Sequence, residues 1–160
     1  MTVALPAVER HHVGVDSPAR IQITIDCTDP ATLAAFWAQA LGYVLQPPPA
    51  DFGSWPEALA AWGVPESDWN SASAVVDPQA AGPRLFFQRV PEPKAGKNRL
   101  HLDLSVSGGP ETPAEQKRAQ ILPTVRRLID LGATEVGPVE EMGSVWVVMQ
   151  DPEGNEFCVT

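Results

Sequence analysis

The feature that most constrains the fold of this 160-residue chain is an internal repeat. The segment RIQITIDC at residues 20–27 alternates apolar and polar side chains, and RLHLDLSV at residues 99–106 does the same. A period of two is typical of a β-strand with one buried face. Each segment leads into a helical pattern and then into a hairpin pattern. The chain is therefore predicted to contain two copies of one β-α-β-β-β unit.

Helix signals follow both strands. In the first copy, Asp29 suits the N-cap and Pro30 the first turn of a helix that ends at Gly42. In the second copy, TPAE at residues 112–115 has the form of a capping box before an apolar helical pattern. Pro123 lies within this second pattern, so we expect a kink or two short helices there.

Each copy ends with a strand, an Asp-Pro turn and a strand, at residues 73–90 and 145–160. Aspartate, asparagine and glycine accept the backbone angles of tight turns. A short stretch after each helix can add one more strand. This order predicts an α+β fold and excludes a doubly wound parallel sheet.

A segment rich in proline and tryptophan, residues 47–70, interrupts the first copy and contains a predicted short helix at 56–63. We call this segment the insert. Its three tryptophans are expected to close the end of the core, where tryptophan commonly packs. A lid and an oligomer contact are the alternatives. The predicted division is a flexible leader at 1–18 and a domain at 19–160 made of modules 19–93 and 97–160.

Composition and charge limit the partners. A hydrophobic content of 44% with 19% charged residues is typical of a packed globular protein. The net charge of −9 repels phosphate backbones and argues against a nucleic-acid partner. The sequence shows neither a membrane-spanning apolar run nor a signal peptide, and two cysteines make no disulfide framework. These features favour a cytoplasmic protein without a membrane partner.

Three stretches carry a resemblance to a known family. ITIDCTDPATLAAFWAQALGY, PRLFFQRVPEPKAGKNRLHLDLSV and MQDPEGNEFCV together resemble the glyoxalase/bleomycin-resistance/dioxygenase superfamily, also called vicinal oxygen chelate proteins, over about residues 20–160. More narrowly, the chain is similar to glyoxalase-like domain proteins. The resemblance implies two paired modules whose curved, mainly antiparallel sheets surround a cleft.

The resemblance also implies a metal position. In the family's metalloenzymes, the first and last strands of each module supply the ligands of one divalent ion. The corresponding positions here are Gln22, His101, Cys158, and either Phe87 or Gln88, depending on register. Divalent ions that prefer oxygen ligands need carboxylates, which these positions lack. A divalent metal held by Gln22 and His101 would therefore have an incomplete ligand set.

The polar sides of the matching strands supply the candidate catalytic residues. His101 and Asp103 lie two residues apart, and a carboxylate beside an imidazole raises its pKa and suits general acid–base catalysis. The alternative is a structural or solvated pair. Asp26 is the corresponding carboxylate of the first module and a candidate for substrate binding, although it can instead bond backbone amides near the helix start.

Strands that border the implied cleft also carry candidates for substrate binding. Phe87 and Trp146 can form an aromatic wall for a flat organic ligand, and the Gln88 amide can orient it. The alternative for the aromatic residues is ordinary core.

Two functions stay open. The first is a glyoxalase-like lyase, isomerase or dioxygenase that acts on a small organic substrate in the cleft. The second is sequestration of a drug or metabolite without catalysis, as in bleomycin-resistance proteins. The missing carboxylates favour binding or metal-free catalysis. Paired-module proteins of this type often form dimers, so a homodimer is also expected.

Overall fold

The computed structural model describes residues 20–160, and the predicted leader at 1–18 lies outside them. The elements of the first module are β1 (Gln22–Cys27), α1 (Pro30–Leu41), β2 (Val44–Leu45), α2 (Trp55–Ala61), the 3-10 turn η1 (Glu66–Asp68), β3 (Ala72–Val76) and β4 (Arg84–Arg89). The elements of the second are β5 (Asp103–Leu104), α3 (Ala114–Asp130), β6 (Thr134–Glu141), β7 (Ser144–Gln150) and β8 (Glu156–Val159). The predicted β-α-β-β-β repeat is confirmed, with α2 and η1 inserted in its first copy.

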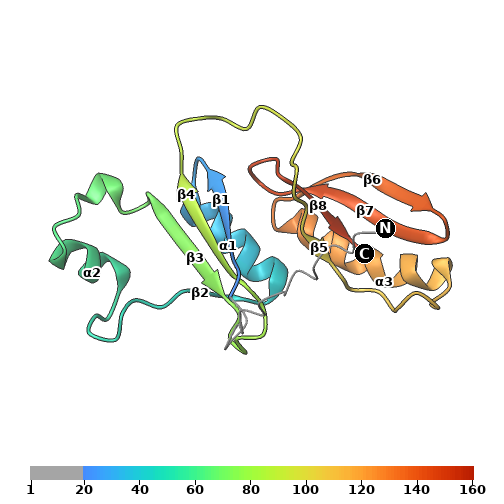
Figure 1. The fold of residues 1–160 in the computed structure, drawn as a ribbon, viewed down its shortest axis with the longest axis horizontal. Coiled ribbons are helices and arrows are strands. Elements are labelled where there is room, and N and C mark those ends of the chain that lie inside the picture. Colours follow the sequence, from blue (N-terminus) through green and yellow to red (C-terminus); the bar gives the residue numbers. More distant parts are fainter. Residues whose placement is uncertain (1–19) are drawn as a thin grey trace, which may run out of the picture.

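Each module forms one four-stranded sheet, and the two sheets have the same topology (Figure 1). The strand orders are β1-β4-β3-β2 and β5-β8-β7-β6. In both sheets the first strand pairs in parallel with the last strand of its module, and the other pairs are antiparallel. The fold is therefore α+β with two mixed sheets. Within residues 20–160, no helix is long and apolar enough to cross a membrane.

Helix α1 begins and ends as its sequence predicts. The Asp29 carboxylate accepts a hydrogen bond from the backbone N–H of Thr32 at 3.3 Å, which satisfies one free donor of the first turn. The helix ends at Gly42, whose φ of 69° lies in the left-handed region that glycine adopts without steric cost.

Helix α3 departs from two predictions. Its N-cap is Pro113 and no side chain caps it, so the predicted capping box at 112–115 is wrong. The backbone N–H of Thr112 instead donates to Gly109 O in a turn. The helix also continues through Pro123 for 17 residues, so the alternative of two short helices is wrong, while the predicted kink stays a prediction. Pro123 lies on an exposed side of α3, where water can reach the carbonyl that the proline ring leaves without a donor.

Strand β5 is much shorter than residues 99–106 predict. Only Asp103 and Leu104 are paired in the ladder, with Cys158 and Val159 of β8. The apolar side of the predicted strand is correspondingly incomplete, because Leu100 is 65% exposed. The strand ladder thus begins after His101, which lies in the connection between the modules.

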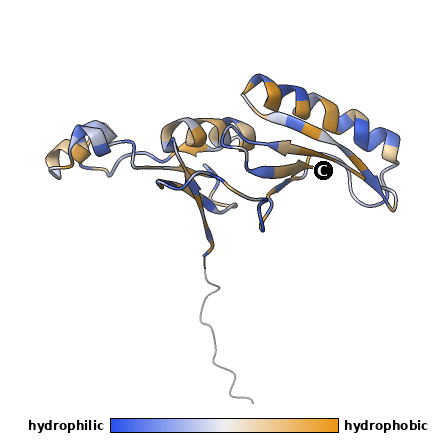
Figure 2. Ribbon diagram, turned by 90° about the horizontal axis from the view of Figure 1, so that it is seen from above, coloured by the Kyte–Doolittle hydropathy of each residue, from blue (hydrophilic) through white to orange (hydrophobic). Residues whose placement is uncertain are grey.

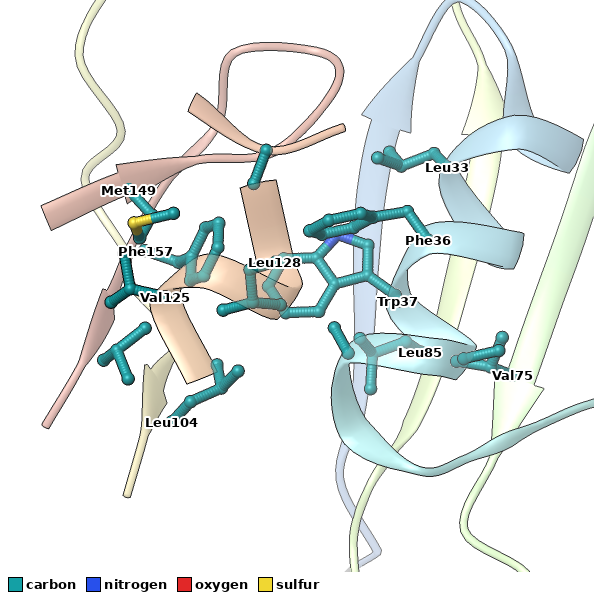
Figure 3. Close-up of a cluster of buried hydrophobic side chains, with 14 of the residues drawn as sticks. Leu33, Phe36, Trp37, Val75, Leu85, Leu104, Val125, Leu128, Met149 and Phe157 are labelled. Carbon is teal, nitrogen blue, oxygen red and sulfur yellow. The ribbon is translucent and has the colours of Figure 1, made fainter. Parts of the chain in front are cut away.

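One hydrophobic core spans both modules. Trp37 of α1 points toward the second module, where its ring centroid lies 5.2 Å from that of Phe157 on β8 (Figure 3). Leu128 and Val125 of α3 belong to the same buried cluster. Figure 2 shows α1 and α3 on the same side of the molecule, with the sheets extending away from them. The opposite face of the first sheet is left for the candidate site.

The insert does not close this core, contrary to the expectation for its tryptophans. Trp62 is 53% exposed, and Trp55 and Trp69 are half-buried outside the core cluster. Helix α2 lies at the end of the molecule far from α3 (Figure 1). Trp62 instead packs within the insert, where its ring centroid lies 5.7 Å from that of Phe52 and 6.3 Å from that of Trp55.

Candidate functional site

The face of the first sheet that α1 leaves uncovered carries a row of polar side chains. Alternation along β1 leaves Gln22, Thr24 and Asp26 exposed. The parallel register sets these residues beside three residues of β4, in the pairs Gln22–Arg84, Thr24–Phe86 and Asp26–Gln88. The shared face is therefore polar at both ends and aromatic in the middle.

Arg84 is held at one end of this face. Its Nη1 donates to Gln22 Oε1 at 2.5 Å, and its Nε donates to Gln46 Oε1 at 2.6 Å. Its guanidinium carbon also lies 4.9 Å from the centroid of the Phe86 ring, within the range of a cation–π contact. Two neutral amides and one aromatic ring thus fix the position of a positive charge.

The residues present do not fit the divalent ion that the resemblance implies. The Gln22 oxygen, the expected ligand atom, accepts from the Arg84 guanidinium, whose charge would repel a metal ion there. Burial raises the pKa of the Cys158 thiol, and the neighbouring Asp103 raises it further, so the thiolate needed for ligation is disfavoured. Residues 20–160 contain no group of three or more histidine, cysteine or acidic side chains placed to hold a metal.

His101 and Asp103 are both exposed. The Nε2 atom of His101 lies 3.3 Å from the carbonyl oxygen of Asn98, and within the described chain no hydrogen bond joins the imidazole to Asp103. Neither residue lines either of the two cavities described below. Their predicted catalytic role stays a prediction.

The predicted substrate-binding residues divide between the two faces. Asp26 and Gln88 do share the uncovered face, where Gln88 Nε2 donates to Asp26 Oδ1 at 2.8 Å. Phe87 is fully buried in the core against α1, so its predicted place in the cleft is wrong. The strand register instead places Phe86, the preceding residue, on the uncovered face. Trp146 is half-buried on β7 and lines neither cavity.

A cavity of about 520 Å³ lies between the modules, and we call it the inter-module cavity. It is lined by Thr24 and Asp26 of β1, by Glu156 of β8 and by parts of the connection between β4 and β5. Glu156 pairs with Lys94 at 3.2 Å and accepts from the backbone N–H of Asn98 at 3.0 Å. These contacts lower the pKa of the Glu156 carboxyl to about 2, chiefly through the Asn98 hydrogen bond.

Another acid of the inter-module cavity also serves the contact between the modules. Glu153 Oε1 accepts from the backbone N–H groups of Thr28 and Asp29 at 3.0 and 2.9 Å, just before α1 begins. Its carboxylate is therefore already engaged by the protein. Glu153 therefore bonds the start of α1 from the second module, and Glu156 is held by Lys94 and Asn98.

A second cavity of about 450 Å³ lies between the insert and the uncovered face of the first sheet, and we call it the insert cavity. The sheet contributes Ala72, Ala74, Arg84 and Phe86, and the insert contributes Trp55, Leu59 and Trp69. Most of these side chains are apolar. This cavity could not be predicted from the sequence, because the pattern of the tryptophans favours a place at the end of the core.

Two internal hydrogen bonds hold the aromatic walls of the insert cavity. Trp55 Nε1 donates to the carbonyl oxygen of Gln46 at 2.7 Å, and Trp69 Nε1 donates to that of Val64 at 3.0 Å. Asn70, also in the lining, ties the end of the insert to α1, because its side chain accepts from the N–H of Ala31 and donates to Asp29. The cavity is therefore largely formed without a ligand.

Comparison with known proteins agrees with this architecture. A glyoxalase/bleomycin resistance protein/dioxygenase family enzyme from Burkholderia phytofirmans is similar in structure, with a TM-score of 0.57, 16% identity, and coverage of 86% of this chain and 94% of that one. A possible glyoxalase from Bacillus cereus gives a TM-score of 0.55 at 13% identity, covering 90% of this chain and 99% of that one.

A third similar structure is a fosfomycin resistance protein from Listeria monocytogenes, solved with Mn(II) and 1S,2S-dihydroxypropylphosphonic acid. Its TM-score is 0.52 at 11% identity, with coverage of 86% of this chain and 85% of that one. Among proteins with curated descriptions, none matches. The family model of the glyoxalase-like domain matches residues 22–160. The chain therefore belongs to the glyoxalase-like domain family.

Proposed function

We propose that this protein binds a small organic molecule in the insert cavity. The observation that carries the proposal is a concave space of about 450 Å³ walled by Trp55, Trp69 and Phe86. Pockets for small molecules commonly measure about 300–1,000 Å³ and are lined by aromatic side chains with a few polar groups. The preformed walls reduce the ordering cost of binding.

We expect this binding to need no divalent ion. The Gln22 oxygen already accepts from Arg84, and the Cys158 thiol favours its protonated form, so neither is available as a metal ligand. This favours sequestration of a compound over the metal-dependent reactions of the superfamily. A catalytic role of His101 and Asp103 is a separate prediction that does not enter this proposal.

Titration with N-phenyl-1-naphthylamine, an uncharged fluorescent aromatic probe, tests the proposal. We expect saturable binding that persists in EDTA and weakens by at least about fivefold in Trp55→Leu, since an aromatic contact contributes about 1 kcal/mol beyond its buried area. Trp146→Leu tests the competing site predicted from the sequence. Absence of binding, or weakening by Trp146→Leu and not by Trp55→Leu, would contradict the insert cavity as the site.

A further inference from the structure

Among the described residues that line the insert cavity, Arg84 alone is charged, and none is an aspartate or a glutamate. Arg84 also takes part in none of the ion pairs formed within residues 20–160. A guanidinium keeps its charge at any pH a protein tolerates. The lining therefore carries a positive charge that none of its own side chains neutralises.

The partners of Arg84 orient it without cancelling this charge. Gln46 and Gln22 are neutral amides that accept from its Nε and Nη1 atoms. Its Nη2 donates to no other residue of the described chain. A guanidinium presents its N–H groups in one plane and bonds carboxylate or sulfonate oxygens with matching geometry. Arg84 is thus placed to receive an anionic group of a ligand.

Gln46 contacts both an aromatic wall of the insert cavity and Arg84. The carbonyl oxygen of Gln46 accepts from the Trp55 indole, while its side-chain oxygen accepts from Arg84. The backbone N–H of Gln46 donates to Ala74 O, so β3 holds this residue in place. Since the indole N–H groups of Trp55 and Trp69 already have partners, these rings require no polar group from the ligand. A ligand should therefore combine a flat apolar body with one acid group.

We infer that the insert cavity selects a flat aromatic compound that carries a carboxylate or a sulfonate, with the acid group on Arg84 and the ring against Trp55, Trp69 and Phe86. This inference rests on the proposed function and adds the chemical class of the ligand. The net charge of −9 disfavours anions at long range. The preference for an anion must therefore come from the local contact with Arg84.

Two probes with the same ring skeleton test the inference. 8-Anilinonaphthalene-1-sulfonate carries a sulfonate, and N-phenyl-1-naphthylamine does not. We expect Arg84→Met to weaken sulfonate binding at least about tenfold more than it weakens binding of the uncharged probe, because a charge-assisted hydrogen bond is lost. Arg126→Met is the matched control, because Arg126 is an exposed arginine of α3 that lines neither cavity. It should change neither affinity.

A second variant tests the inference if Arg84→Met does not fold. Arg84→Lys keeps the charge but loses the planar fork, so it should weaken only the sulfonate, by severalfold. If the native protein binds both probes and the Arg84 variants weaken neither or both alike, the anion inference is overturned and the cavity stands. If the native protein binds neither probe, the proposed function is overturned, and the inference with it.

Discussion

One buried carboxylate, that of Asp151, connects the hairpin turn of the second module to the core. It is 3% exposed, and its Oδ2 accepts from Trp37 Nε1 at 3.1 Å. Its Oδ1 accepts from the backbone N–H groups of Glu153 and Asn155 at 3.0 and 2.9 Å. Burial raises the pKa of this carboxyl, and the hydrogen bonds oppose the shift. In the sequence, Asp151 signals only a turn, because its partner on α1 is more than a hundred residues away.

Asp151→Ala should lower the free energy of unfolding by about 2–4 kcal/mol. The change removes several hydrogen bonds and leaves the buried indole N–H of Trp37 without its acceptor. Urea unfolding followed by circular dichroism measures the effect. Asp51→Ala, at an exposed site, should stay within about 0.5 kcal/mol of the native protein. Equal effects of the two substitutions would show that the contact with Trp37 is not important.

At the scale of the element, α3 continues through a proline that its sequence pattern predicts to kink or divide it. The face formed by Ile121, Val125 and Leu128 is buried in the common core, and Pro123 lies between these residues on an exposed side. Burial of the apolar face therefore outweighs the local cost of one lost hydrogen bond. Local signals could not decide this, because the compensation comes from the packing of the whole helix.

Pro123→Ala should stabilise the protein by about 1–3 kcal/mol. Alanine restores the backbone donor to the carbonyl of Ala119 and is the most favourable helix residue. Thermal unfolding would show a higher midpoint for this variant. Gln116→Ala, at another exposed site of α3, should shift the midpoint much less. An unchanged or lower midpoint for Pro123→Ala would mean that proline is already suited to this position.

At the scale of the whole molecule, acidic side chains of the second module hold the first module and the connection between them. Glu153 accepts from the backbone just before α1, and Glu156 accepts from Asn98 and pairs with Lys94 in the connection. Together with the contact of Trp37 with Phe157, the bonds of Glu153 join the two modules (Figure 3). The contact between the modules thus combines a shared apolar core with hydrogen bonds to one carboxylate.

Stability should fall in acid through Glu156. Its pKa is lowered from 4.5 to about 2, so the folded state favours the ionised form. A lowered carboxyl pKa contributes stability above the unfolded value, and this contribution is lost as pH falls from about 4.5 toward 2. The free energy of unfolding of the native protein should therefore decline more steeply over this range than that of Glu156→Gln. Glu135→Gln, at an exposed site of β6, should follow the native protein. Parallel curves for the native protein and Glu156→Gln would contradict the assignment.

The candidate site could be predicted from the sequence only in part. The alternation in β1 correctly placed Gln22 and Asp26 on one face, since the strand period alone decides this. In β4 two phenylalanines follow each other, and only the pairing register decides that Phe87 enters the core and Phe86 faces the insert cavity. The sequence also does not reveal Arg84 as a candidate anion contact, because the residues that orient its side chain are distant in the chain.

The sequence by itself determined the order of the elements, the repeat of the two modules and the caps of α1, because these depend on strand and helix periods and on residues adjacent in the chain. Only the tertiary structure decided which phenylalanine of β4 is buried, where the insert lies and which partners surround Arg84 and Asp151. These features depend on contacts between segments far apart in sequence, and neither the period nor the identity of a residue specifies which distant segment covers it.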